Sequence, residues 1–300
     1  MTQTNIVNDN GLGKNGNIIK KISAILELIK FSHTIFSIPF VIMSAFIAAS
    51  GLPSTRQIII IIFAVIMARS CAMAFNRLVD VKYDEQNSRT SYRVSYQKFI
   101  GKTYLWIFFI VCTLLFVCLS WMLNMLSLIM APIALLVLLG YSFTKRFTNA
   151  SHFVLGAALG LAPIGAWVGI TGELALPPFI LGLAVLLWTA GFDVIYACQD
   201  YEHDKAMDLF SIPKRFGIKT ALKISWVLHL LTVVLLFMLI YYTDLGFIYA
   251  AGVCGVAGLL LYEHTLVKPD DLSKINIAFF NVNGMISIGL MVVTIIDIFV

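Results

Sequence analysis

Two groups of polar residues in this sequence share one spacing, and their side chains are of the types that bind cations. The first group is Asn76, Asp80 and Asp84, and the second is Asp193, Asp200 and Asp204. Asp80 lies 120 residues before Asp200, and the same offset separates Asp84 from Asp204. Residues four apart lie on one face of a helix, so each group is predicted to present a short row of carboxylates.

Several carboxylates that converge on one cavity need counter-charges. Two of them about 4 Å apart repel by about 4 kcal/mol at an effective dielectric constant of about 20. Oxygen ligands favour Mg2+ over zinc or copper, and Mg2+ commonly completes its coordination with substrate phosphate oxygens. Basic residues that could bind phosphate follow in the neighbouring loops: Arg89, Arg93, Lys145, Arg146 and Lys205. A single Asp at a helix end is usually only solvated, and a single basic loop residue usually only sets topology, but together they predict a diphosphate site.

The elements that must position these residues are membrane-spanning helices. Of the 300 residues, 60% are hydrophobic and only 12% are charged, and the mean hydropathy of +0.91 is far from that of a soluble protein. Nine apolar segments approach the roughly 20 residues that cross a bilayer: 31–50, 58–79, 104–122, 125–142, 152–170, 176–197, 222–241, 246–264 and 276–298. The predicted fold is an all-α integral membrane bundle of nine transmembrane helices. It forms a single domain over residues 21–300, after a flexible polar tail at residues 1–20.

Positive charge marks the cytoplasmic side of a membrane protein. All 21 basic residues except Arg56 and Arg69 lie in the N-terminal tail or in every second loop between the apolar segments. The N-terminus and both acidic groups are therefore predicted to lie in the cytoplasm, and the C-terminus outside. The same distribution accounts for the net charge of +5, so a nucleic-acid partner is not expected.

The two acidic groups follow the second and the sixth apolar segments, which are four crossings apart. An even number of crossings restores the direction of the chain, so the two halves suggest a parallel repeat. The match is local, because Tyr196 takes the place of Asn76 and Asp193 aligns with Met73. Chance agreement of two short motifs is the alternative explanation.

Three runs of the sequence resemble motifs of the UbiA-type intramembrane aromatic prenyltransferases. AFNRLVDVKYDEQNSRTSYR (74–93) resembles their first acidic motif, and YSFTKRFTN (141–149) and DVIYACQDYEHDKAMDLFSIPKRFG (193–217) resemble their fourth-loop and second acidic motifs. The chain is most similar to 4-hydroxybenzoate polyprenyltransferases, including members placed in the futalosine route to menaquinone. The resemblance implies an enzyme of the bacterial inner membrane. Its substrates would be a polyprenyl diphosphate and an aromatic acid. The enzyme would transfer the polyprenyl chain to a ring carbon of the acid in ubiquinone or menaquinone biosynthesis.

The resemblance also implies roles for single residues. One Mg2+ would be held by Asn76, Asp80 and Asp84, a second by Asp200 and Asp204, and the diphosphate by Lys145 and Arg146. Arg89 and Arg93 are expected to bind phosphate as well. After Arg93, however, family members often carry a proline- and glycine-containing turn where this chain reads VSYQKFIGK, so the cap over the site is expected to close differently. Lys205 is assigned to the substrate on its charge and position alone.

Two ionisable residues lie deeper in the predicted spans. Asp193 precedes Asp200 by seven residues, and Arg69 precedes Asn76 by seven. Intramembrane groups of this kind are usually functional. Asp193 could orient the acceptor's hydroxyl group or take the ring proton as catalytic base, and Arg69 could pair with the acceptor's carboxylate. The alternatives are a structural polar partner for Asp193 and an ion pair between Arg69 and Asp193.

Two competing functions stay open from the sequence. A secondary transporter would use intramembrane acids as ion sites, but such sites lie near the membrane midplane, whereas most of these acids fall at the cytoplasmic ends of the predicted spans. Within the UbiA superfamily, a naphthoate, haem or chlorophyll-type acceptor is the other alternative. The pocket around Arg69 and Asp193 would decide between these acceptors.

Overall fold

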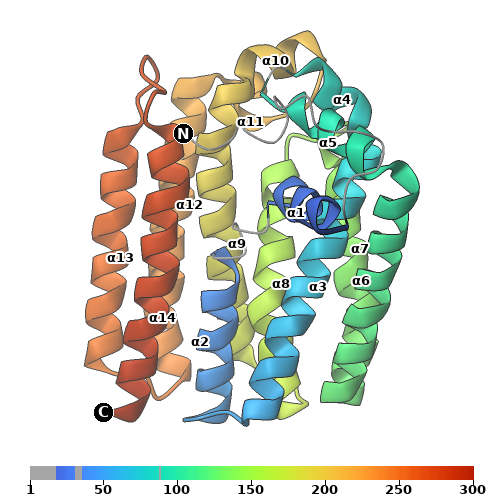
Figure 1. Ribbon diagram of the computed structural model, residues 1–300. Coiled ribbons are helices and arrows are strands. Elements are labelled where there is room, and N and C mark those ends of the chain that lie inside the picture. The colour runs from blue at the N-terminus through green and yellow to red at the C-terminus, as the bar shows by residue number, and fades with distance from the viewer. Residues whose placement is uncertain (1–17, 31–35, 88) are drawn as a thin grey trace.

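The computed structural model describes residues 18–30, 36–87 and 89–300, and these residues form a bundle of helices without β-strands (Figure 1). The bounds of the helices are α1 Ile18–Leu28, α2 Ile38–Ala49, α3 Thr55–Val79, α4 Val81–Gln86, α5 Tyr92–Ile100, α6 Lys102–Leu123, α7 Met125–Thr144, α8 Ser151–Thr171, α9 Leu176–Ala197, α10 Tyr201–Ala206, α11 Ile212–Phe216, α12 Ile218–Leu239, α13 Phe247–Leu266 and α14 Asn283–Phe299. Short 3-10 turns follow α9 (Cys198–Asp200) and α12 (Ile240–Tyr242), and a π-helix (Ile277–Val282) leads into α14.

Eight helical segments of the described residues are long and apolar enough to cross a membrane. They centre on α3, α6, α7, α8, α9, α12, α13 and α14. A helix satisfies its backbone hydrogen bonds internally, which is the condition for crossing lipid. Large apolar side chains point outward from these helices, such as Leu114 of α6 and Leu136 of α7, which are 65% and 75% exposed. The prediction of an all-α, multi-pass membrane protein is confirmed.

The first predicted span, at residues 31–50, differs from the other eight. Its helix α2 begins only at Ile38 and has 12 residues, or about 18 Å of helix, against a hydrocarbon core about 30 Å thick. Residues 31–35, the start of the predicted span, lie outside the described part of the chain. The count of nine transmembrane helices therefore stays a prediction. Most of the predicted tail, residues 1–17, also lies outside the described part, and α1 begins at Ile18, inside the range predicted as tail.

The short helices α4, α5, α10 and α11 gather at one end of the bundle, and the C-terminus lies at the opposite end (Figure 1). Both acidic groups belong to the end with the short helices, as the alternation of basic loops predicts. The assignment of that end to the cytoplasm stays a prediction.

Helix α9 runs through the middle of the bundle and packs between α8 and α12 (Figure 1). Its side chains are mostly buried, among them Trp188 at 1% exposure. Gly156 and Gly160 let α8 approach α9 closely, since a Cβ on Gly160 would collide with the carbonyl oxygen of Gly182. The helix that carries Asp193 is therefore held by close backbone packing against α8 on one side and by packing against α12 on the other.

The two halves repeat in backbone as well as in sequence. Asp80 follows α3 with φ −97° and ψ 7°, and Asp200 ends the 3-10 turn after α9 with φ −94° and ψ 7°. Each is followed by a helix of 6 residues, α4 or α10. Each half then passes through a second short helix and a glycine at positive φ (Gly101 at 91°, Gly217 at 80°) into a helix of 22 residues, α6 or α12. The equal spacing of the acids thus reflects equal local structure.

Candidate active site

A polar cavity of about 220 Å³ lies where α3, α7 and α9 meet the short helices. Ten of the twelve residues predicted for the site line it: Asn76, Asp80, Asp84, Arg89, Arg93, Lys145, Arg146, Asp193, Asp200 and Asp204. The fold therefore brings the two acidic groups, from opposite halves of the chain, to one cavity.

Asp80 is held by side chains from α3 and from the end of α7. Asn76 donates from Nδ2 to Asp80 Oδ2 at 2.7 Å and to Ser142 Oγ at 3.3 Å. Arg146 donates from Nη2 to Asp80 Oδ1 at 2.9 Å and to the Val79 carbonyl at 3.0 Å. Burial raises the pKa of the Asp80 carboxyl, and the Arg146 guanidinium opposes that shift. Both oxygens of Asp80 are thus engaged.

Asp84 is buried between two arginines. Arg77 Nη1 lies 3.2 Å from Asp84 Oδ2, and Arg93 Nη1 lies 2.9 Å from Oδ1. The side chains of Arg77 and Asp84 are only 5% and 8% exposed. The Thr90 hydroxyl donates to the Asp84 backbone carbonyl at 3.3 Å, which fixes the start of α5 against α4. Asp84 therefore neutralises the buried charge of Arg77.

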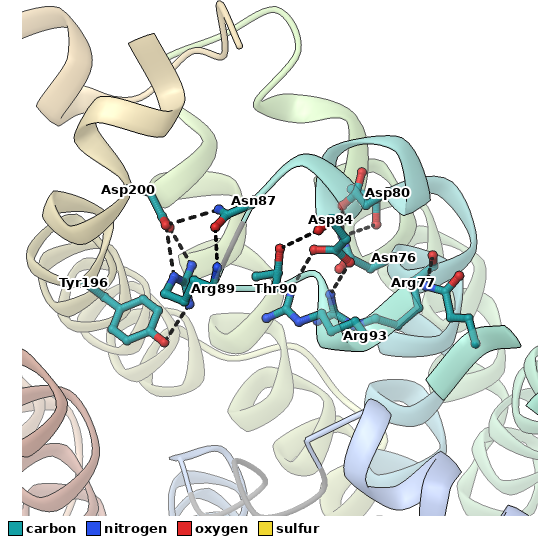
Figure 2. A network of polar contacts seen from close by, with 12 residues as sticks. Asn76, Arg77, Asp80, Asp84, Asn87, Arg89, Thr90, Arg93, Tyr196 and Asp200 are labelled. Atoms are coloured by element: carbon teal, nitrogen blue, oxygen red, sulfur yellow. Dashed lines mark hydrogen bonds and ion pairs between the residues drawn. The ribbon is translucent and has the colours of Figure 1, made fainter. Parts of the chain in front are cut away.

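The segment between α4 and α5 ties the two acidic groups together (Figure 2). Arg89 donates from Nε and Nη2 to the two oxygens of Asp200, at 3.0 and 2.6 Å, and from Nη1 to the Tyr196 hydroxyl at 3.0 Å. Four residues later, Arg93 reaches Asp84 of the first group. The stretch from Arg89 to Arg93, which runs from the loop after α4 into the start of α5, therefore bridges both halves of the site.

Asp204 and Lys145 are the charged groups of the cavity that form no ion pair with a described residue. Asp204 is 2% exposed, and its Oδ2 has no hydrogen-bond partner. Burial lowers the pKa of Lys145, but Asp204 and the other acids of the cavity raise it by more, so the net shift is upward. The Lys145 ammonium therefore stays charged and has its donors available.

The cavity is close to charge balance. Its five carboxylates are those of Asp80, Asp84, Asp193, Asp200 and Asp204, and its five cations are Arg77, Arg89, Arg93, Lys145 and Arg146. A polyanion that entered would leave an excess of negative charge. Binding such an anion therefore requires further cations.

Asp193 has a partner that the sequence did not indicate. Its Oδ2 lies 2.7 Å from Nδ1 of His152, the second residue of α8, and that imidazole is fully buried. The backbone N–H of Ile212 donates to the other ring nitrogen, Nε2, at 3.5 Å. The structural polar partner considered for Asp193 therefore exists, and it is His152.

A second, mostly apolar cavity of about 190 Å³ lies between α3, α6, α7 and α8. It meets the polar cavity at Asn76 and Tyr141, which line both. Arg69 faces this interior space, as predicted, and its Nε is buried without a hydrogen-bond partner. The alternative of an Arg69–Asp193 ion pair is wrong for this structure, because Asp193 pairs with His152 instead.

Lys205 is the one predicted site residue that lines neither cavity. Its side chain is exposed, with Nζ 4.2 Å from the centre of the Tyr201 ring. Successive residues of a helix point about 100° apart. Because Asp204 faces the cavity, the next residue on α10, Lys205, points away from it. The phosphate contact predicted for Lys205 is not supported by this position.

The fold also adds residues to the cavity that the sequence reasoning missed: Arg77, Asn87, Tyr141, Tyr196 and His203. Helical spacing could have indicated three of them, since Arg77 lies two turns before Asp84, and Tyr141 and Tyr196 lie one turn before Lys145 and Asp200. His203 stands between Asp200 and Asp204, so the donors around the second acidic group include a nitrogen. His152 carried no signal, because its partner is 41 residues away on another helix.

Among the described residues, no group of three or more His, Cys, Asp or Glu side chains is arranged to hold a metal ion. The chemistry of the donors nevertheless suits a hard cation, because most are carboxylates and Asp204 has a buried oxygen without a partner. To bind such a cation, Asp80, Asp84 and Asp200 would each have to release the guanidinium groups that now pair with them. The residues present fit a divalent metal after that release.

The fold and the site together define a multi-pass helical membrane protein with a charged cavity that joins an apolar one. The sequence profile of the UbiA prenyltransferase family matches residues 37–285. The chain belongs to this family, which confirms the resemblance of its motifs, and it is an enzyme, a prenyltransferase.

Individual relatives agree with this assignment. A 4-hydroxybenzoate octaprenyltransferase of Vibrio parahaemolyticus is 31% identical over 250 residues, which cover 82% of this chain and 87% of that protein. The enzyme of the same description from Photobacterium profundum is 28% identical over 267 residues, or 88% and 92% of the two chains. Among solved structures, the apo UbiA homologue of Aeropyrum pernix K1 superposes with a TM-score of 0.80 at 28% identity, covering 89% of this chain and 98% of that one. A UbiA homologue of Archaeoglobus fulgidus, solved with GPP and Mg2+, shares the fold with a TM-score of 0.70 at 19% identity over 92% and 100% of the chains.

Proposed function

We propose that this enzyme transfers a polyprenyl chain from its diphosphate to a ring carbon of an aromatic acid similar to 4-hydroxybenzoate, with Mg2+, in the biosynthesis of ubiquinone or menaquinone. The bacterial relatives described as 4-hydroxybenzoate octaprenyltransferases support this acceptor and a location in the bacterial inner membrane. The observation that carries the proposal is the junction of a charged cavity with an apolar one.

The junction of the two cavities suits a substrate with one charged and one apolar end. The diphosphate would lie among the cations of the polar cavity, and the isoprenoid chain would lie in the apolar cavity. The bond that breaks would then lie near Asn76 and Tyr141, since both residues line both cavities. Lys145, with its donors available, and Arg146 would contact the departing diphosphate.

The charge balance of the polar cavity supports a role for divalent cations. A diphosphate brings several negative charges into a cavity whose own charges already cancel. Asn76, Asp80 and Asp84 would hold one Mg2+, and Asp200 and Asp204 a second. The bound cations would neutralise charge on the leaving diphosphate. Arg89 and Arg93, released from Asp200 and Asp84, would be free to bind phosphate oxygens.

The acceptor would lie beside the same junction. Arg69, an arginine without an ion pair among the described residues, would bind the acceptor's carboxylate from the apolar side. Asp193 would face the acceptor from the polar side and accept the ring proton. Enclosure of the site within the bundle would keep water from reacting with the allylic cation.

The test is prenyl transfer by the purified protein in detergent or lipid. We expect Mg2+-dependent release of diphosphate, together with a prenylated 4-hydroxybenzoate identified by mass spectrometry. Chelation of the metal should abolish both, and added Mg2+ should restore them. A product only with a naphthoate, haem or chlorophyll precursor would assign the enzyme to another branch of the family, and no product with any acceptor would overturn the proposal.

A further inference from the structure

We propose that His152 is a positioning residue that holds Asp193 in the orientation needed to accept the ring proton. This inference rests on the proposed function, because it assigns a role to a residue behind the group that faces the acceptor. Asp193 lines the polar cavity, whereas His152 is fully buried and lines neither cavity.

The hydrogen bonds around His152 define its tautomer. Ile212 is the first residue of α11, and the N–H groups of a first helical turn have no partner within the helix. This N–H donates to His152 Nε2 at 3.5 Å, so Nε2 must be the unprotonated nitrogen. Nδ1 therefore carries the proton and donates it to Asp193 Oδ2 at 2.7 Å.

This geometry leaves one oxygen of Asp193 for chemistry. Oδ2 accepts from His152, while Oδ1 has no hydrogen-bond partner among the described residues and belongs to a carboxyl group that lines the cavity. After the prenyl group has bonded to the ring, the C–H bond at that carbon breaks and its electron pair restores the aromatic ring. The proton goes to Asp193 Oδ1, and His152 keeps its own proton throughout.

Three elements fix the pair. His152 comes from α8, Asp193 from α9 and the Ile212 N–H from α11, and a fully buried imidazole without such partners would be costly. Neither of the two cavities reaches the imidazole, so His152 would not contact a substrate bound in them. What remains for His152 is orientation of the carboxylate, since loss of its hydrogen bond would let Asp193 rotate away from the ring.

The test compares His152→Leu, which fills the space without a donor, with His152→Gln, whose side-chain amide can still donate to Asp193. The kcat of His152→Leu should fall by about 10- to 100-fold, the effect of one hydrogen bond to a charged group. His152→Gln should keep kcat within about fivefold, and the KM for prenyl diphosphate should stay unchanged in both. With 4-hydroxybenzoate deuterated at the two ring carbons beside the hydroxyl, His152→Leu should show a larger isotope effect on kcat than the unmodified enzyme, because proton removal has become slow.

A matched control is His229→Leu, which removes a histidine that is 2% exposed and bonded to His264, away from both cavities. It should lower thermal stability without changing the isotope effect. The double variant His152→Leu/Asp193→Asn should be no slower than Asp193→Asn alone, since the histidine acts through the carboxylate. Additive losses, or a loss in His152→Leu without a larger isotope effect, would overturn the inference.

These measurements separate the two proposals. If the unmodified protein prenylates no aromatic acid, the proposed function fails. If it does so and His152→Leu is as fast, only the role of His152 fails. Should His152→Leu not accumulate in the membrane, His152→Gln takes its place in both tests. Its isotope effect should then equal that of the unmodified enzyme, and adding it to Asp193→Asn should cause no further loss of kcat.

Discussion

Asp84 and Asp204 occupy equivalent positions in the two halves, yet their surroundings predict opposite effects of substitution on stability. Both are buried, at 6% and 2% exposure. Asp84 neutralises Arg77, whose side chain is 5% exposed, and also pairs with the more accessible Arg93. Asp204 has no ion pair with a described residue, and its Oδ2 has no hydrogen bond.

The magnitude follows from the buried pair. Removing one partner of a buried ion pair costs about 3–5 kcal/mol, because the other charge stays buried without compensation. Asp84→Asn should therefore destabilise the protein by about 3 kcal/mol, with little added for Arg93, whose side chain is 18% exposed and better solvated. At roughly 2 °C per kcal/mol for a chain of this size, the unfolding midpoint should fall by about 6 °C. Asp204→Asn removes a buried charge that forms no ion pair and attracts Lys145 only at longer range, so its midpoint should stay the same or rise.

The assay is thermal unfolding of the purified protein in detergent without substrate or added metal, beside diphosphate release with both present. We expect both variants to lose prenyl transfer and only Asp84→Asn to lose stability. Equal losses of stability, or a larger loss in Asp204→Asn, would refute the reasoning from ion pairs.

Three further predictions use the same preparation. Lys145→Met should weaken binding of inorganic diphosphate by about 10- to 100-fold in calorimetric titration, because the Lys145 ammonium has donors available. The unfolding midpoint of this variant should not fall, and unchanged binding would remove Lys145 from the site. Gly160→Ala should lower the unfolding midpoint, because the new Cβ would collide with the α9 backbone. Gly165→Ala should not lower it, because its Cβ would lie in open space. Equal midpoints of the two variants would contradict the close packing of α8 on α9. A periplasmic reporter fused to the C-terminus should be active in a bacterial host, and an inactive one would reverse the orientation that the basic loops predict.

The parts of this protein that the sequence could predict are those set by local structure. Apolar length and basic loops predicted the multi-pass bundle, and four-residue spacing predicted the carboxylate rows, because a helix turns residues four apart to one face. The phosphate contact of Lys205, predicted from its charge and position, is not supported, because the residue adjoins a cavity-lining acid but is exposed outside the cavity. For the first predicted span, residues 31–50, the described helix α2 begins at Ile38 and residues 31–35 lie outside the described part of the chain, so that span stays a prediction.

The partners of the acids could not be predicted, because they come from elements distant in sequence. His152 reaches Asp193 from α8, and Arg89 crosses from the first half to Asp200 in the second. Such contacts depend on how the helices pack, and packing is decided by details such as the close approach of α8 to α9 at Gly160. Only a guess at the tertiary contact would have identified them.

The repeat explains why the two halves of the site differ in charge although their backbones match. The arginines of the first half have no counterparts at the 120-residue offset in the second, where Arg77, Arg89 and Arg93 are replaced by Ala197, Leu209 and Pro213. Asp200 is therefore paired with an arginine of the first half, and Asp204 has none. A cation that bound the second acidic group at Asp204 would displace no guanidinium, whereas one at Asp84 would have to displace two. Although one spacing predicted both carboxylates, they have different roles in the protein before any substrate binds, because only Asp84 neutralises a buried arginine, Arg77.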